Sequence, residues 1–349
     1  MTATTPMPPP RMLTGDRPTG RLHLGHYVGS LTSRVRLNAT HESFFIVADL
    51  HMLTTKNTRA DIGLVHGHAR DMVLDSLAAG LDPARSVFFL QSAVPQIAEI
   101  AMLLASLVTV PRLERIPSLK QMARDAGQRV MPFALLGYPV LQAADILSVR
   151  ATVVPVGRDN AAHVEVAREI ARRFNRQYGP VFPVPSLVPA DVPALPGTDG
   201  RAKMSKSLGN AIYLADPPEV VHRKVMGMYT DPRRTRPDLP GTVEGNPVFG
   251  YLDAFGDRPA EVAALKDRYR AGRVGDVAVK EYLAAALNRF LDPMRRRRAE
   301  FARDPALVAG LIAGGSERTR REVARTVAAM REAMGLDAAS EEFARQRAG

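Results

Sequence analysis

The sequence of 349 residues contains no cysteine. A chain without cysteine forms neither a disulfide framework nor a thiolate metal site, and this absence is typical of proteins made and kept inside the cell. No apolar run approaches the length that crosses a bilayer. Residues 1–10 lack the charged start and apolar centre of a signal peptide, and their prolines and threonines predict a disordered tail. We therefore expect a cytoplasmic protein with no membrane contact.

The composition, with 46% hydrophobic and 24% charged residues, is that of a globular protein. The chain is longer than a single hydrophobic core usually supports, so we expect one large domain and a smaller one. The formal net charge of +11 favours an anionic partner such as nucleic acid, although a bias toward arginine alone also produces such an excess. Charge alone does not distinguish a nucleic-acid partner from a bias toward arginine, so the sequence motifs are needed.

The first half of the chain alternates short apolar runs with helical patterns, which predicts a doubly wound parallel α/β sheet of the Rossmann-like type. Strands are expected at 11–14, 43–48, 86–90 and 153–156, and helices at 25–37, 62–77 and 160–174. Gly80 occupies the place of a C-cap glycine after the second helix. Pro155 favours an edge or strand-end position for the last strand.

The pattern changes after about residue 214, where no convincing strand follows and amphipathic helices are expected at 261–291 and 305–334. We therefore predict a domain at 11–213 and a helical domain at 214–349. The proline-rich and charged segment 229–248 reads as a long surface connection. The arginines at 295–298 are interpreted as a solvated helix face, with a contact to a nucleic acid as the alternative.

The first candidate motif spans residues 15–26 and lies where the first strand turns into the first helix. In an open α/β sheet this turn is where backbone N–H groups meet phosphate. Gly25 lets a nucleotide approach the backbone, and His23 and His26 can donate hydrogen bonds to phosphate oxygens as charge builds on them. Alternatively, the two histidines only decorate a helix start. A zinc pair is a weaker alternative, because no further ligand lies nearby.

The second candidate motif is Lys203-Met204-Ser205-Lys206-Ser207, flanked by Gly197, Gly200 and Gly209. Two lysines on a glycine-flanked loop can close over a polyphosphate and neutralise a departing pyrophosphate. A loop of this composition, taken alone, is usually a solvated surface turn. In this order and at this separation, however, the two segments resemble the paired ATP signatures of class I aminoacyl-tRNA synthetases.

This resemblance implies a reaction in two steps. An amino-acid carboxylate attacks the α-phosphate of ATP, giving aminoacyl-adenylate and pyrophosphate, and the acyl group then passes to the terminal ribose of tRNA. Catalysis of this kind rests on positioning and charge stabilisation, so no nucleophilic side chain is needed. The resemblance also implies Mg²⁺ with the ATP phosphates, no dedicated metal site, a homodimer, and an anticodon-binding role for 214–349.

From residue 13 to about 335 the chain resembles the tryptophanyl-tRNA synthetases, through the segments at 14–20, 26–31, 49–51, 142–147 and 154–160. The implied catalytic residues are His23, His26, Lys203, Lys206 and Lys120. The implied ATP-binding residues are Arg17, Pro18, Thr19, Gly25, His26, Gly157, Arg158, Asp159, Leu195, Lys203, Met204, Ser205, Lys206 and Ser207. The implied tryptophan-binding residues are Asp145, Leu13, Gly15, His51, Tyr138, Gln142, Val154, Val156 and Asn160.

Asp145 is the predicted acceptor for the indole N–H, since burying that donor unpaired costs about 1–3 kcal/mol. Helix capping is its structural alternative. Tyr138, Gln142 and Asp145 also stand at the spacing with which tyrosyl-tRNA synthetases bracket a phenolic hydroxyl, so tyrosine is the alternative substrate. Arg17, Gln142 and Asn160 depart from residues usual in the tryptophan branch, which motivates the hypothesis of an isoform with altered inhibitor sensitivity or with an auxiliary role.

Two other protein classes compete with this interpretation. A non-catalytic synthetase-like protein that binds RNA is expected to lose one ATP motif, whereas this chain keeps both. A small-molecule nucleotidyltransferase of similar fold is expected to lack the helical part after residue 214. Both features favour an ATP-using tRNA synthetase.

Overall fold

The strands at 42–47 and 86–90 are rich in aromatic and β-branched residues, and nearly all of their side chains are buried, as is usual in parallel sheets. The computed structural model describes residues 10–125, 127, 129–157, 161–189, 195–200, 204–206, 208–231 and 234–348. The strands are β1 Arg11–Asp16, β2 Glu42–Val47, β3 Ser86–Leu90, β4 Val153–Val156 and β5 Ser186–Pro189. They pair in parallel in the order β3-β2-β1-β4-β5, which confirms the predicted doubly wound fold.

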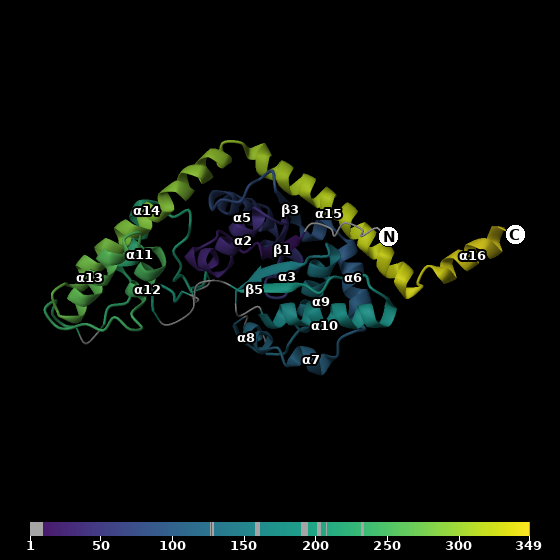
Figure 1. Ribbon diagram of the computed structural model, residues 1–349, viewed down its shortest axis with the longest axis horizontal. Coiled ribbons are helices and arrows are strands. Elements are labelled where there is room, and N and C mark those ends of the chain that lie inside the picture. The colour runs from purple at the N-terminus through teal and green to yellow at the C-terminus, as the bar shows by residue number, and fades with distance from the viewer. Residues whose placement is uncertain are drawn as a thin grey trace, which may run out of the picture.

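Helices cover both faces of this sheet (Figure 1). Those of the first part are α1 Leu24–His26, the π-helical turn η1 Tyr27–Leu31, α2 Thr32–Asn38, α3 Asp49–Met52, α4 Arg59–Gly63, α5 Val65–Ala78, the 3-10 turn η2 Gln91–Ala93, α6 Gln96–Ala105, α7 Val110–Glu114, α8 Pro117–Asp125, α9 Phe133–Ser148 and α10 Ala161–Tyr178. Those of the second part are α11 Pro218–Met226, α12 Pro247–Phe255, α13 Pro259–Arg270, α14 Asp276–Ala302, α15 Pro305–Met334 and α16 Ala338–Ala348.

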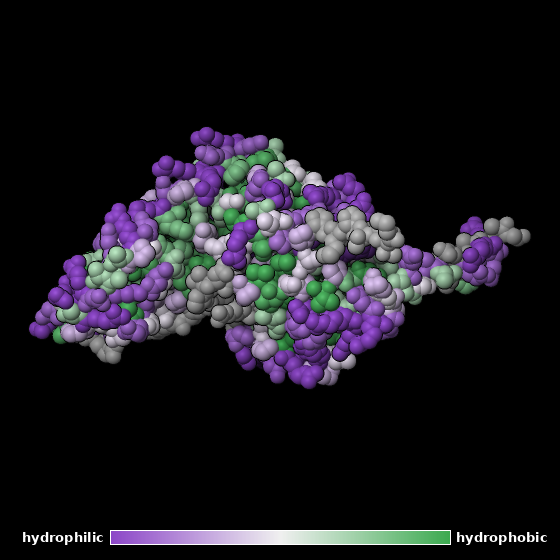
Figure 2. All heavy atoms as spheres, in the orientation of Figure 1, coloured by the Kyte–Doolittle hydropathy of each residue, from purple (hydrophilic) through white to green (hydrophobic). Residues whose placement is uncertain are grey.

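Neighbouring residues of each strand enter opposite cores, because side chains alternate across a sheet. Phe45 and Phe88 pack with α5 and with the helices α11 to α14. Phe44 and Phe89 pack with α6, α9 and α10 on the other face. In Figure 2 polar side chains dominate the outer surface of α13, α7 and α8, and apolar ones gather toward the middle of the face.

The helix predicted at 62–77 is wrong at its start. Leu64 interrupts it, and Ile62 belongs to the separate helix α4 with an exposed side chain. The C-cap prediction for Gly80 is confirmed, since its φ is 119° and the N–H groups of residues 80 and 81 return to the carbonyls of Leu77 and Ser76.

Of the two positions predicted for Pro155, the sheet edge is wrong and the strand end is confirmed, since Pro155 is the second-last residue of β4. β4 lies inside the sheet, and β5, which the sequence pattern did not reveal, forms that edge. Pro155 is tolerated there because the ladder between β1 and β4 is limited to Met12 and Val153, before the missing N–H. The Pro155 carbonyl instead accepts a hydrogen bond from the Thr14 hydroxyl at 3.2 Å.

In the second part the single helix predicted at 261–291 is wrong, because α13 ends at Arg270 and α14 begins at Asp276. The helix predicted at 305–334 is confirmed as α15. α15 lies along the edge strand β3 (Figure 1), where the Ser316 hydroxyl accepts from the Leu90 N–H at 3.1 Å. The segment 229–248 is not only a surface connection, because Arg234 within it is buried and paired with Asp276.

The arginines at 295–298 do not form a solvated face. Arg295 donates to the Asp216 carbonyl, Arg297 donates to the Ala78 carbonyl, and Arg298 pairs with Asp71 and Asp75. Only Arg296, with its side chain 77% exposed beside Asp292, fits the prediction. Helical periodicity could not reveal this, because the partners lie on other elements. α14 is thus joined to α5 by two arginines.

Residues 1–9 of the predicted tail lie outside the described residues. Among the described helices, none is long and apolar enough to cross a membrane. The domain boundary predicted at 213 remains a prediction. α11 to α14 continue one core of the sheet, and α15 returns to β3.

Candidate active site

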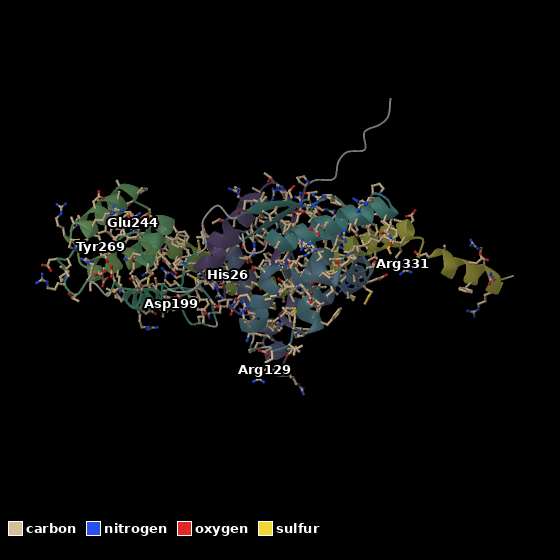
Figure 3. All side chains as sticks on the ribbon, turned by 90° about the horizontal axis from the view of Figure 1, so that it is seen from below. His26, Arg129, Asp199, Glu244, Tyr269 and Arg331 are labelled. Carbon is tan, nitrogen blue, oxygen red and sulfur yellow. The ribbon has the colours of Figure 1, made fainter. Side chains whose placement is uncertain are left out.

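The carboxyl ends of β1 and β4 meet where the strand order reverses, which is the usual ligand site of a doubly wound sheet. The chain leaves β1 at Asp16 and runs through residues 17–23 into α1. Figure 3 shows His26 near the junction between the sheet and the helical body that carries Glu244 and Tyr269. Both predicted ATP motifs have described residues at this junction.

His23 and His26 cap the start of α1. The Nδ1 atom of His23 accepts from the Gly25 N–H at 3.1 Å, and the Nδ1 atom of His26 accepts from the His23 N–H at 3.2 Å. Because each Nδ1 atom accepts, the neutral form of each ring carries its proton on Nε2. Both histidines therefore cap the helix start, and their predicted contact with ATP remains a prediction.

Residues of the second motif contact this helix start directly. The Gly25 N–H also points to the Met204 sulfur at 3.3 Å, and a Cβ atom at residue 25 would lie 3.0 Å from the His23 ring. Met204 is buried, and its N–H donates to the carbonyl of the buried Leu195 at 3.4 Å. Lys206 Nζ donates to the Gly20 carbonyl at 2.8 Å and lies 3.4 Å from the Thr19 hydroxyl.

Asn210 holds the loop that carries the second motif. Its Oδ1 atom accepts from the Ser205 N–H at 2.8 Å, and its Nδ2 atom donates to Asp199 at 3.2 Å. Tyr213 then forms an antiparallel bridge with His23. The segment that follows the second motif is thus joined to the first motif through its backbone. Lys203 and Ser207 lie outside the described residues.

A hollow of about 280 Å³ opens between the two motifs. It is lined by Thr19, Gly20, Arg21, His68, Asp71, Lys206 and Tyr213. Burial lowers the pKa of Lys206 to about 8, although Asp16 and Asp75 oppose the change. Arg17 is exposed and donates to the Thr55 hydroxyl, whereas Pro18 is buried with its carbonyl 3.0 Å from His68 Nδ1.

Asp16 lies beneath this loop and was not predicted as a site residue. Its Oδ2 atom is 2.5 Å from Nη1 of the buried Arg34. Burial alone would raise the pKa of Asp16, but Arg34, His26 and Lys206 together hold that pKa well below its usual range. An ionised Asp16 therefore stabilises the positive charges around it. A carboxylate at the end of a first strand is the signal that could have found it.

The predicted amino-acid pocket is centred on a closed polar network. Asp145 Oδ2 accepts from His51 Nε2 at 2.8 Å, and Asp145 Oδ1 accepts from Gln91 Nε2 at 2.8 Å. Gln91 Oε1 in turn accepts from the His51 N–H at 3.3 Å. Burial raises the pKa of Asp145, and the bonds from His51 and Gln91 oppose the change. The helix-capping alternative for Asp145 is wrong, since its carboxylate bonds to His51 in α3 and to Gln91 in η2.

Gln91, His163 and Ser118 were missed. Gln91 is fully buried and is the first residue after β3, a position typical of ligand sites in such sheets. Buried His163 lies with its Nε2 atom 2.8 Å from both the Tyr138 hydroxyl and the Ser118 hydroxyl. The Tyr138 ring stands edge-on to His51 at 5.9 Å between ring centroids.

Other predicted pocket residues have packing roles. Leu13 and Val154 are buried in the core beside α9, and Val156 is partly buried at the end of β4. Gly15 lies against β2, where a Cβ atom would stand 1.9 Å from the Ile46 carbonyl oxygen. Packing alone therefore requires glycine at residue 15.

The structure shows no contact among its described residues that tests the roles of the remaining predicted residues. Gln142 and Gly157 are partly exposed, and Lys120 is exposed on α8. Arg158, Asp159 and Asn160 lie outside the described residues. Within the described parts of the chain, no group of three or more His, Asp or Glu side chains could hold a metal ion.

Known proteins resemble the chain over nearly its whole length. The family model for class I tRNA synthetases of the W and Y types matches residues 5–292. The tryptophan–tRNA ligase of Treponema pallidum is 60% identical over 94% of this chain and 97% of its own length. The tryptophan–tRNA ligase of Borreliella burgdorferi is 48% identical over 93% of each chain.

The chain belongs to the tryptophanyl-tRNA synthetases. The predicted class I synthetase and the predicted tryptophan–tRNA ligase are thereby confirmed. The synthetase from Campylobacter jejuni, solved with ADP and tryptophan, superposes with a TM-score of 0.78 at 30% identity and covers 93% of this chain and 99% of its own. A tyrosyl-tRNA synthetase from Archaeoglobus fulgidus reaches a TM-score of 0.59 at 27% identity over 83% of this chain and 90% of its own. Tryptophan is therefore favoured over the tyrosine alternative.

Proposed function

We propose that this chain activates L-tryptophan with ATP and transfers it to tRNA(Trp). The carboxylate of tryptophan attacks the α-phosphate, the bond to the β-phosphate breaks, and pyrophosphate leaves. A terminal ribose hydroxyl of tRNA then attacks the acyl carbon and AMP leaves. The contact between Gly25 and Met204, which joins the two ATP motifs at the end of β1, carries this proposal.

ATP binding is proposed at the hollow between the motifs. The Nε2–H donors of His23 and His26 would meet the α-phosphate, where charge builds during attack. Lys206 is held beside Gly20 and would exchange that carbonyl for an oxygen of the leaving pyrophosphate. Lys203 is proposed to do the same from the other end of its motif, and Lys120 on α8 is proposed to reach the phosphates or the tRNA acceptor end.

The nucleotide is further proposed to contact Arg17, Pro18, Thr19 and the loop after β4. Gly157, Arg158 and Asp159 carry that loop contact, with Asp159 on the ribose hydroxyls. Mg²⁺ is proposed to arrive as the substrate complex with ATP, held by phosphate oxygens. Leu195 and Met204 form the apolar support of the nucleotide site.

Tryptophan is proposed to bind beside Asp145. The carboxylate already accepts from His51 and Gln91, and each oxygen has a second lone pair for the indole N–H. Leu13, Gly15, Tyr138, Gln142, Val154, Val156 and Asn160 are proposed to complete the pocket.

We also propose a cytoplasmic homodimer whose helical part, residues 214–349, binds the tRNA anticodon. The formal net charge of +11 supports a polyanionic partner. Large exposed apolar side chains at Met102 on α6, Val110 on α7 and Phe133 on α9 support self-association, because these helices adjoin one another.

The deciding experiment is ATP–pyrophosphate exchange driven by tryptophan or by tyrosine. Exchange is expected with tryptophan only, and charging of tRNA(Trp) is expected to follow. Exchange with neither amino acid would overturn the activation step. Exchange with tyrosine only would reverse the proposed specificity. The spacing of Tyr138, Gln142 and Asp145 would then explain recognition of the phenolic hydroxyl.

A further inference from the structure

One face of α5 holds residues 17–22, the loop within the first ATP motif that leads to His23. His68 Nδ1 donates to the Pro18 carbonyl at 3.0 Å, and Asp75 Oδ2 accepts from the Leu22 N–H at 2.8 Å. Asp71 Oδ2 lies 3.7 Å from Arg21 Nε. The three α5 residues are spaced i, i+3 and i+7, which places them on one side of the helix. α5 therefore sets the course of this loop.

The two carboxylates of this face share one cation from a distant helix. Arg298 on α14 donates from Nε to Asp75 Oδ1 at 2.7 Å and from Nη2 to Asp71 Oδ1 at 2.5 Å. Asp75 is fully buried, and the guanidinium side chain is 18% exposed. The planar fork of arginine can serve two acceptors at once, whereas lysine presents a single point charge.

The position of these groups gives the contact an electrostatic consequence. Asp71 lines the same hollow as Thr19, Gly20 and Lys206. Without Arg298, the Asp71 carboxylate beside this hollow would keep only its 3.7 Å contact with Arg21 and would repel a triphosphate more strongly. Asp75 also fixes the N–H of Leu22, the residue directly before His23. Loss of the clamp would therefore change both the charge and the geometry of the loop.

We propose that Arg298 and Asp75 are positioning residues for ATP, through which α14 sets the loop at 17–22. This inference rests on the proposed ATP site. Neither residue lines the hollow between the two motifs. Arg298 acts through Asp75 and Asp71, and Asp75 acts through the backbone of Leu22. A shift of α14 relative to α5 would therefore move the loop at 17–22.

The experiment compares Arg298→Met with Arg297→Met in tryptophan-driven ATP–pyrophosphate exchange. Arg297 is the matched control, because it also joins α14 to α5, through the Ala78 carbonyl, but contacts neither carboxylate. Arg298→Met is expected to raise KM for ATP about tenfold and to leave KM for tryptophan within about twofold, since only the ATP loop loses its support. Arg297→Met is expected to keep both values within about twofold.

Two further variants protect the test against misfolding. Arg298→Lys keeps the charge but not the fork, so a partial rescue of KM for ATP is expected. Asp75→Asn combined with Arg298→Met removes both charges of the buried pair and should fold, because no buried charge is left alone. The double variant still lacks the link to α14, so its KM for ATP is expected to stay about fivefold above that of the wild type.

The outcomes separate this inference from the proposed function. An active wild type whose Arg298 variants match Arg297→Met, or whose double variant has an unchanged KM for ATP, would overturn the positioning role alone. A rise in KM for tryptophan equal to that for ATP would also overturn it, because it would indicate general loss of structure. A wild type without exchange would overturn the proposed function and this inference with it.

Discussion

The charge of Lys206 can be tested by changing the pH, because its pKa lies within the range in which the enzyme can be assayed. Burial lowers its pKa to about 8, so the amine is cationic below that pH and neutral above it. A neutral amine cannot attract phosphate. We expect KM for ATP in the exchange reaction to be constant up to about pH 7 and to rise about tenfold by about pH 9.

Lys206→Arg provides the control for this pH profile. Arginine keeps its proton throughout this range, so the rise in KM for ATP should disappear in this variant even if its absolute activity is lower. If the variant and the wild type show the same rise, the titrating group is not Lys206. The profile would then be due to another group or to ATP itself.

Asp145 tests the specificity of the amino-acid pocket. Asp145→Ala is expected to weaken tryptophan binding by about 1–3 kcal/mol, because an indole N–H buried without an acceptor loses that much. The chain contains no tryptophan, so fluorescence of the bound substrate can be followed without background from the protein. Unchanged affinity would mean that the acceptor lies elsewhere.

Ser148→Ala is the matched control for Asp145→Ala. Ser148 is buried on the same helix and its hydroxyl donates to the Asp145 carbonyl rather than to the carboxylate. Removal of this hydroxyl is expected to leave tryptophan affinity unchanged. Equal losses in both variants would indicate damage to α9 instead of loss of an acceptor.

Sequence reasoning at this scale found the residues with strong motif context and missed those without it. His23, His26 and Met204 were named from two motifs, and the structure brings described residues of both motifs into contact. Gln91 and His163 were missed because a single polar residue after a strand or in a helix has no distinctive pattern. Their partners Asp145 and Tyr138 come from another part of the chain.

At the scale of elements, α15 packs closely on its neighbour β3, and this contact constrains its sequence. β3 is an edge strand, and an uncovered edge invites pairing with other chains. α15 covers it, and Gly315 allows the close approach: a Cβ atom there would stand 1.9 Å from the Phe88 carbonyl oxygen. The helix was predicted from periodicity, but its contact with β3 was not.

Gly315→Ala is therefore expected to lower the free energy of unfolding by about 1–3 kcal/mol, because the backbone of β3 cannot move away from the added methyl group cheaply. Gly314→Ala is the control, since nothing lies within 4 Å of its Cβ position. That change is expected to be neutral or to stabilise the helix by about 0.5–1 kcal/mol. Urea unfolding followed by circular dichroism measures both, and equal stabilities would contradict the packing of α15 on β3.

At the scale of the whole molecule, the proposed homodimer can be tested by measuring the mass of the protein in solution. Met102 is 75% exposed and Phe133 is 86% exposed, on the adjoining helices α6 and α9. Met102→Asp combined with Phe133→Asp is expected to halve the mass measured by sedimentation, because charges cannot be buried in an apolar interface without partners.

Val277→Asp is the control for this double change. Val277 is 63% exposed on α14, away from α6 and α9 in sequence, and its replacement is expected to leave the mass unchanged. A wild type that sediments as a monomer would remove the dimer from the proposal. A double variant with unchanged mass would place the interface elsewhere.

The sequence by itself determined the fold class, the helical second part, the two ATP motifs and the resemblance that relatives at 60% and 48% identity confirm. Those features depend on local periodicity and on short segments, which are readable without knowing what lies beside them. Tertiary structure alone decided that α15 covers β3, that β4 is internal, and that Arg298 reaches Asp75 across 223 residues of chain. Such contacts join segments whose local patterns are independent of each other, so only the packed chain selects them.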